Sequence, residues 1–419
     1  MASVERQIIR ICKAAREASR YLALADTEKK NDALEGMARA LIKRVDYILD
    51  ANAKDARNAR AAGLPSAMID RLLLNVKRIR SMADSISEIA RLGDPVGEVL
   101  EFKKAPSGIL IGKMRVPIGV ILVIYESRPN VTSDCAALCL KSGNSVILRG
   151  GSEALNSNTA IYKTLKAALR GFPEGIINLI TRPGRGIVRT LLRQSGYIDL
   201  VMPRGGESLI SDVTRFSRIP VIKHYKGVCH TYVDKSCDLA MARRICMNAK
   251  VQRPAVCNAM ETLLVHKDIA DIFLPMIAKN LKSSGVEIRG CDRTRKILRD
   301  EDIRPAKEDD WYAEYLDLIL SVKVVDGLDA AIAHITKYGS SHSDSIVTDD
   351  HSQALKFLKR IDSACVYVNA STRFTDGKEF GKGAEIGIST DKIHARGPMA
   401  LEELTSYKYI IFGKGQIRG

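Results

Sequence analysis

The first 92 residues carry the hydrophobic spacing of helices. Apolar residues from Ala33 to Leu49 recur at intervals of three and four positions, which predicts a buried helical stripe. Gly63-Leu64-Pro65 interrupts this pattern, and it resumes from Met68 to Ile89. The stretch carries no evident chemistry, so we expect a packing layer.

From residue 93 onward, apolar runs typical of strands alternate with helical segments. Val99–Phe102 and Gly108–Val116 have β-like patterns, and Val120–Tyr125 is the continuous apolar run of a parallel strand buried on both faces. The alternation that follows predicts a doubly wound α/β domain. Its expected helices are 131–142, 153–170, 184–195 and a short one after 206, and its further strands are 145–148, 176–180, 197–202 and 220–222.

A second α/β unit is expected after residue 230. Its expected helices are 237–250, 268–282, 328–337 and 351–360, and its strands are 261–265, 323–325, 345–347 and 366–369. The tail, 406–413, is also strand-like. Because a terminal strand without a neighbour frays, we expect the tail to pair with a partner subunit.

Composition and charge narrow the class of protein. The 419 residues are 46% apolar and 27% charged, which is typical of a globular protein of two or three domains. The net charge of +16 raises the alternative of a basic binding protein without turnover. The basic residues are interleaved with acids, however, and no nucleic-acid-binding signature is present. A basic surface also suits small anions, so we expect no nucleic-acid partner.

The sequence predicts a cytoplasmic protein without a metal site. It has no run of about 18 apolar residues, and its N-terminus lacks the apolar core of a signal peptide. Nine cysteines without CxxC pairs indicate free thiols in a reducing compartment. Cys229, His230 and Cys237 do not have the spacing of zinc ligands. We therefore expect neither a membrane partner nor a bound metal.

Two strand ends of the first α/β domain carry glycine-rich turns into helices. These turns are Arg149-Gly150-Gly151-Ser152 and Arg204-Gly205-Gly206. Glycines allow a ligand to approach the backbone, helix N-termini attract phosphate, and arginine can bind phosphate through two N–H groups. We expect a dinucleotide phosphate site here, although the first strand is not followed by GxGxxG.

Cys257 lies on a polar, Pro-containing loop between a helix and a buried strand. Arg253 precedes it by four residues, so the thiol can be partly exposed in a positive field, which favours a nucleophilic thiolate. The alternative is a structural cysteine, because most cysteines are small buried hydrophobic residues.

Several motifs resemble the gamma-glutamyl phosphate reductase family of the aldehyde dehydrogenase superfamily. They are Val116-Pro117-Ile118-Gly119-Val120, Ile124 to Thr132, Leu140 to Gly151, Gln252 to Asn258 and Ala384 to Thr390. The resemblance implies NADPH-dependent reduction of L-glutamate 5-phosphate to L-glutamate 5-semialdehyde through a cysteine thioester, the second step of proline biosynthesis from glutamate. Another acylating aldehyde dehydrogenase on the same fold, for example a CoA-linked one, is the alternative.

The resemblance also implies an aldehyde dehydrogenase-like organisation with two doubly wound domains and a small β arm. Residues 1–105 and 117–227 would form the NADP-binding domain with its helical layer, and 228–399 the catalytic domain. Residues 106–116 and 400–419 would form an oligomerisation arm. A homodimer or homotetramer is expected, with a glutamate 5-kinase as a candidate partner.

The resemblance assigns the cofactor and nucleophile positions. Cys257 matches the family's nucleophile, and Glu314 matches the glutamate that holds the nicotinamide ribose. Arg149 falls where the wider superfamily has a lysine near the adenine ribose, and Ser152 stands where NAD-preferring relatives often carry a glutamate on the ribose hydroxyls. Arginine with serine suits the 2′-phosphate of NADPH.

The sequence leaves three roles open. The oxyanion side chain is Asn130 or lies in the region of Glu126. His224 stands near where aldehyde-oxidising relatives carry a water-activating glutamate, and a non-acid there fits an acyl intermediate exchanged with phosphate. Asn369, Ser371 and Arg373 follow a strand and are candidates to bind the amino-acid head of the substrate, with an ordinary polar turn as the alternative.

Overall fold

The computed structural model describes residues 2–223, 226–299 and 302–418 and divides into two compact units. Unit 1 comprises residues 1–223, 381–387 and 399–419, and unit 2 comprises 224–380 and 388–398. The expected boundary at 227 falls shortly after the observed one. Residues 381–387, expected in the second domain, pack with unit 1.

Helices cover the N-terminal part of unit 1, as the spacing predicts. The expected stripe from Ala33 to Leu49 is nevertheless divided between two helices, because Arg44 leaves helical geometry at φ −112° and ψ 27°. Ile42, an expected core position, is 46% exposed. The helices are α1 (Ala2–Leu22), α2 (Thr27–Lys43), α3 (Val45–Ala61), α4 (Ser66–Leu72) and α5 (Val76–Arg91).

The parallel sheet of unit 1 has the strand order β5-β4-β3-β6. Central β3 (Val120–Tyr125) is buried along its whole length, as its continuous apolar run predicts. The expected strand at 220–222 is wrong, because this segment makes only an isolated bridge at Val221. The other elements are β4 (Ser145–Gly150), β5 (Ile177–Leu179), β6 (Leu200–Arg204), α6 (Asn130–Lys141), α7 (Leu155–Lys166), α8 (Arg185–Leu191) and α9 (Glu207–Phe216).

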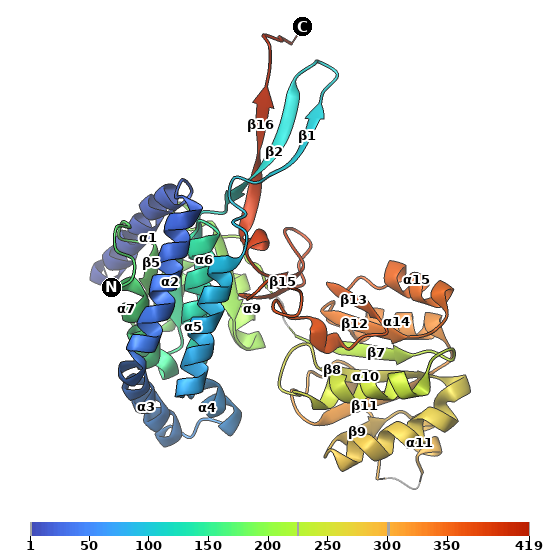
Figure 1. Cartoon of the computed structure of the whole chain (residues 1–419). Coiled ribbons are helices and arrows are strands. Elements are labelled where there is room, and N and C mark those ends of the chain that lie inside the picture. The colour runs from blue at the N-terminus through green and yellow to red at the C-terminus, as the bar shows by residue number, and fades with distance from the viewer. Residues whose placement is uncertain (1, 224–225, 300–301, 419) are drawn as a thin grey trace. The chain divides into compact units, whose positions relative to one another are not determined.

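An antiparallel sheet of order β1-β2-β16 extends away from the helices of unit 1 (Figure 1). It joins β1 (Val99–Lys104) and β2 (Leu110–Pro117) to the C-terminal β16 (Thr405–Phe412). The expectation that the tail finds its partner strand in another subunit is wrong for this edge, since β16 pairs with β2 of the same chain.

Unit 2 is built on a parallel sheet of order β10-β9-β11-β8-β7-β12-β13. Strand β7 (Cys229–Val233) is fully buried but was not predicted, because His230 and Thr231 interrupt its apolar character. The other strands are β8 (Met260–His266), β9 (Glu287–Gly290), β10 (Arg304–Pro305), β11 (Ile319–Val325), β12 (Ser343–Val347) and β13 (Cys365–Val368). The helices are α10 (Leu239–Val251), α11 (Lys267–Ser283), α12 (Asp292–Ile297), α13 (Glu308–Trp311), α14 (Leu328–Tyr338) and α15 (His351–Arg360).

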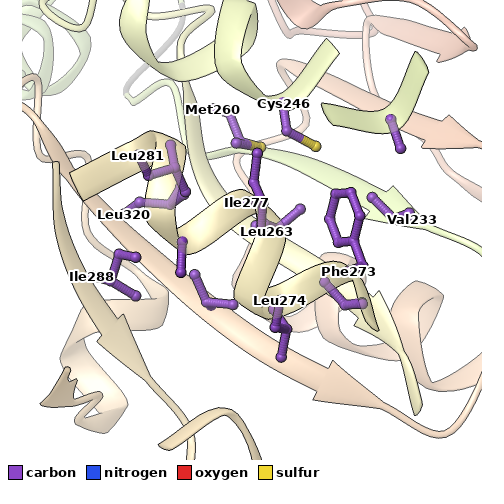
Figure 2. Close-up of a cluster of buried hydrophobic side chains, with 14 of the residues drawn as sticks. Val233, Cys246, Met260, Leu263, Phe273, Leu274, Ile277, Leu281, Ile288 and Leu320 are labelled. Carbon is purple, nitrogen blue, oxygen red and sulfur yellow. The ribbon is translucent and has the colours of Figure 1, made fainter. Parts of the chain in front are cut away.

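A large apolar core fixes the strand that follows Cys257. Phe273 and Ile277 of α11 and Leu263 of β8 belong to one buried cluster, in which the α11 side chains point toward the sheet (Figure 2). Met260, the first residue of β8, is also fully buried in it. The α/β fold with two parallel sheets is the fold class predicted from the sequence. Among the described residues, no helix combines the length and the hydrophobicity that a membrane span requires.

Candidate active site

The Cys257 loop, residues 252–259, connects α10 to β8. Helix α10 ends at Val251, and Pro254 follows shortly, which cannot continue a helix. The N–H of Ala259 donates to the carbonyl of Val256 at 3.1 Å, so the chain turns immediately around Cys257. Cys257 is half-buried on this turn. The buried helix and strand on either side therefore present the thiol on a short, fixed loop.

A second segment, residues 372–375, is hydrogen-bonded to the Cys257 loop. The Asn258 amide nitrogen donates to the carbonyl of Thr375 at 2.8 Å, and the Thr372 hydroxyl donates to the carbonyl of Asn258 at 2.7 Å. The guanidinium of Arg373 donates to the side chain of Asn258 and, at 2.9 Å, to that of Gln252. These bonds hold both ends of the Cys257 loop against residues 372–375.

Gly227 lies directly against the backbone of Cys257. A Cβ added at Gly227 would stand 2.6 Å from the Cα of Cys257 and closer still to its carbonyl oxygen. The N–H of Gly227 donates to Oε1 of Glu314 at 2.9 Å. Glu314, Gly227 and Cys257 are thus consecutive in space within unit 2, although they are far apart in sequence.

Two guanidinium groups contribute positive charge near the thiol. Burial lowers the pKa of Arg373, Arg253 lowers it further, and the opposite charges of Asp376 and Cys257 act to raise it. Arginine remains charged throughout the physiological range, so Arg373 brings positive charge to Cys257, and Arg253 of the same loop adds to the positive charge around Arg373. On the other side, the fully buried Cys229 donates from Sγ to the carbonyl of Cys257 at 3.2 Å. Burial raises the pKa of Cys229 well above its usual value, so it remains a thiol donor.

The three expected substrate residues differ in how the structure uses them. The Asn369 amide bonds both the N–H and the carbonyl of Thr348, each at 2.9 Å, and Asn369 has a positive φ of 55°. Ser371 is only 4% exposed, and its hydroxyl accepts from the N–H of Arg373. Asn369 and Ser371 therefore shape the loop, and Arg373 is the one of the three that interacts with Cys257.

A pocket of about 360 Å³ lies in unit 1 at the carboxyl ends of β3 and β4. Parallel sheets commonly bind ligands at this edge. Its wall combines apolar side chains of α8 and α9 with cationic and acidic groups. The lining includes Val188, Leu192, Leu209, Val213 and Phe216 among the apolar residues, Arg149, Arg185 and Arg189 among the cations, and Glu126, Glu153 and Asp212 among the acids.

The first glycine-rich turn contributes to this pocket. Arg149, Gly151 and Ser152 line it. Nε of Arg149 is buried without a hydrogen-bond partner among the described residues, and burial lowers the pKa of this guanidinium. Glu153 points toward the loop that follows β3, where its Oε1 accepts from the N–H and hydroxyl of Ser127 at 2.7 and 2.9 Å. The turn therefore places a buried guanidinium at the pocket, with the carboxylates of Glu153 and Glu126 close enough to act on its pKa.

The second glycine-rich turn already holds a carboxylate. Oε2 of Glu126 accepts from the N–H of Gly206 at 2.9 Å, the kind of donor that the sequence assigned to a phosphate. Arg204 packs on Gly387, where an added Cβ would meet its Nη1 at 2.6 Å. Neither Arg204 nor Gly205 is among the residues that line the pocket.

Asn130, the candidate oxyanion side chain, is the first residue of α6. Its amide donates to Asp134 at 2.9 Å. Burial raises the pKa of Asp134 to about 6, and the bonds from Asn130 and Ser133 act against this shift. His224 lies outside the described residues.

Sequence reasoning missed several contributors to these two sites. Arg185 and Arg189 occur in a helix without a recognisable motif, and Gly227 precedes an unpredicted strand. Only the Thr-Arg-Pro-Gly-Arg sequence 181–185, basic and Gly-containing before a helix, could have pointed to the pocket. Within the described part of the chain, no three His, Cys, Asp or Glu residues are grouped so as to hold a metal ion.

Comparisons with known proteins identify relatives of this chain. The profile of the aldehyde dehydrogenase family matches residues 1–292. Gamma-glutamyl phosphate reductase of Thermodesulfovibrio yellowstonii is 56% identical over 417 residues, with 99% of each chain covered. The enzyme of that name from Caldanaerobacter subterraneus is 58% identical, with 97% of this chain and 98% of the other covered.

Solved structures give the same picture. The crystal structure of gamma-glutamyl phosphate reductase from Thermotoga maritima superposes with a TM-score of 0.95 at 49% identity, covering 98% of this chain and 100% of that chain. An acetylating aldehyde dehydrogenase from Geobacillus thermoglucosidasius has a TM-score of 0.70 at 16% identity, covering 100% of this chain and 99% of that one. The latter likeness is one of fold.

Proposed function

This chain belongs to the gamma-glutamyl phosphate reductases of the aldehyde dehydrogenase family, and we propose that it reduces L-glutamate 5-phosphate to L-glutamate 5-semialdehyde with NADPH. The observation that carries the proposal is the Cys257 loop. It combines a half-buried thiol, a rigid backbone and the charges of Arg253 and Arg373. An acyl phosphate is an anionic electrophile, and such a site suits it.

In this proposal the Cys257 thiolate attacks the acyl carbon of the substrate. The C–O bond to phosphate breaks, phosphate leaves with the electron pair, and the acyl group remains on sulfur as a thioester. The backbone N–H of Cys257 donates to the developing oxyanion. The guanidinium groups of Arg253 and Arg373 stabilise the negative charge of the substrate and of the departing phosphate.

The unit 1 pocket fits a phosphorylated dinucleotide. Apolar side chains from α8 and α9 offer a surface for a flat base, and the unpartnered Nε of Arg149 offers a donor for a phosphate. Glu153 also lines the pocket, and its Oε1 is bonded to the N–H and hydroxyl of Ser127, which offset part of its charge. When bound, NADPH supplies the hydride that reduces the acyl group. In unit 2, Glu314 would hold the ribose next to the nicotinamide.

Replacing Arg149 with alanine should raise KM for NADPH about 10- to 100-fold and leave KM for NADH almost unchanged. The reason is the loss of charge-assisted bonds to the 2′-phosphate, which NADH lacks. Steady-state kinetics with both cofactors measure this effect. Arg189→Ala is the matched control: Arg189 lies over the ring of Phe216 at 4.3 Å, so its loss should affect both cofactors equally. An equal effect of Arg149→Ala on the two cofactors would remove Arg149 from the phosphate site.

The reaction itself is tested in reverse, with glutamate 5-semialdehyde and NADP+. We expect NADP+ reduction to require inorganic phosphate, because phosphate must release the acyl group from Cys257. Arsenate should replace phosphate, and coenzyme A should not. Equal rates without any added acceptor would indicate hydrolysis and contradict the proposal. Activity with coenzyme A alone would instead identify a CoA-linked acylating dehydrogenase.

A further inference from the structure

A fully buried ion pair closes the base of the Cys257 loop. Lys250 is in the last turn of α10 and Glu261 is the second residue of β8, so the pair stands on either side of the loop. Nζ of Lys250 lies 2.5 Å from Oε2 of Glu261, and both side chains are 0% exposed. The ends of the loop are therefore joined by a charge-assisted bond.

The same carboxylate reaches the segment that carries Glu314. Oε1 of Glu261 accepts from the N–H of Leu316 at 3.2 Å. Leu316 has a φ of 53°, a conformation that costs free energy for a residue other than glycine and needs support from its surroundings. Lys250 also lies 5.8 Å from the centre of the Tyr315 ring. The ion pair thus contacts both residues that follow Glu314.

These contacts connect the base of the Cys257 loop, through the segment that carries Glu314, to the backbone of Cys257. Glu261 holds Leu316, Glu314 of the same segment accepts from Gly227, and Gly227 packs on Cys257. We propose that the Lys250–Glu261 pair is a positioning element that acts through the acceptor Oε1 of Glu261: Lys250 holds the other oxygen, and Oε1 fixes the Glu314 segment, residues 314–316, in register with the Cys257 loop. The inference deepens the proposed function and rests on it, because it gives the nucleophile and the ribose-binding glutamate a common support.

Stability alone does not account for this pair. Burial raises the pKa of Glu261 to about 7, against the opposing effect of Lys250, and burial also lowers the pKa of Lys250. Both shifts show that the charged forms are costly at this place. A buried ion pair can often be replaced by apolar residues of similar volume without loss of stability, whereas removal of one partner is strongly destabilising. A pair that bonds a strained loop next to the site has a positional role that apolar residues could not fulfil.

The test compares two double variants that differ in one side chain. Lys250→Met with Glu261→Gln removes both charges but keeps an acceptor for the N–H of Leu316. Lys250→Met with Glu261→Met removes the acceptor as well. We expect the Met–Gln variant to keep KM for NADP+ within about threefold, and the Met–Met variant to raise it about tenfold. The melting temperatures should be similar, and KM for glutamate 5-semialdehyde should change by less than about threefold in both.

Alkylation of Cys257 by iodoacetamide gives a readout that does not depend on the reaction. The Met–Met variant should be alkylated at least about three times faster than the Met–Gln variant, because a loosened loop exposes the half-buried thiol more often. If the wild-type chain shows no phosphate-dependent reduction of NADP+, the proposed function fails. The alkylation rates then still decide whether the pair positions the loop.

A buried ion pair in unit 1 provides the matched control. Nζ of Lys30 lies 2.5 Å from Oδ2 of Asp94, with side chains 0% and 6% exposed. Lys30→Met with Asp94→Leu should change the melting temperature. It should not change the ratio of KM for NADP+ to KM for glutamate 5-semialdehyde. Equal KM for NADP+ and equal alkylation rates in the Met–Met and Met–Gln variants would overturn the proposal. Failure of the Met–Met variant to fold, while Met–Gln folds, would also overturn it, because the pair would then serve stability.

Discussion

Replacement of Cys257 with serine is expected to reduce phosphate-dependent reduction of NADP+ at least about a thousandfold. Serine fits the same half-buried position, so the loop bonds made by Asn258 and Thr372 should persist. A hydroxyl is a far weaker nucleophile than a thiolate and reacts only when an adjacent general base activates it. The pocket proposed for the cofactor is lined by unit 1 residues, and the bond from Gly227 to Glu314 does not use the thiol. NADPH binding, measured by fluorescence titration, should therefore be nearly unchanged.

Cys237→Ser is the matched control for this variant. Cys237 is a half-buried free thiol of the same unit, and burial, followed by the charge of Asp349, raises its pKa to about 11. It should therefore remain protonated, and its loss should leave kcat within about twofold. Substantial turnover by Cys257→Ser, or an equally large loss in Cys237→Ser, would contradict the assignment of the nucleophile.

Much of this arrangement follows from local sequence. The six apolar residues of β3 predict a strand buried on both faces, and the structure buries all of them. The loop around Cys257 is predictable because a helical pattern ends before Pro254 and an apolar strand begins at Met260. The failures are also physical. Arg44 breaks a helical stripe without glycine or proline, and β7 contains polar residues that its neighbours satisfy, as when Asp344 accepts from both the N–H and Nδ1 of His230.

The features of the candidate site that could not be predicted from the sequence depend on contacts between distant segments. Glu126 and Gly206 are 80 residues apart, and nothing near either one predicts that a carboxylate would occupy the second glycine-rich turn. Asn369 resembles a ligand-binding residue in sequence, but its amide is used by Thr348. Polar residues after a strand indicate that their side chains form hydrogen bonds. They do not indicate whether the partner is a substrate or the main chain.

Gly227 is the clearest example of a contact between distant segments, because it packs on the backbone of Cys257. Its replacement by alanine is expected to lower kcat about a hundredfold. The new methyl group would overlap the backbone of Cys257, so either the Cys257 loop or residues 226–228 must move. Displacement of a reacting group by about 1 Å can cost a factor of this size. Overpacking among side chains typically costs about 1–3 kcal/mol of folding free energy, and a clash with backbone atoms should cost at least the upper end of that range, so a lower melting temperature is expected as well. Steady-state kinetics and thermal unfolding measure the two effects.

Gly327→Ala separates crowding at Cys257 from the general effect of losing a glycine. A Cβ at Gly327 would meet its nearest neighbour, Nε2 of His266, at 3.7 Å, an ordinary contact, and its φ of 162° is extended. This control should keep kcat within about twofold. In Gly227→Ala, KM for the cofactor should rise together with the fall in kcat, because the N–H of Gly227 also holds Glu314. Cys257→Ser, by contrast, should lower kcat and leave cofactor affinity in place. A Gly227→Ala variant with unchanged kcat would show that the Cys257 backbone can shift without cost, and the close packing at Gly227 would then have no catalytic meaning.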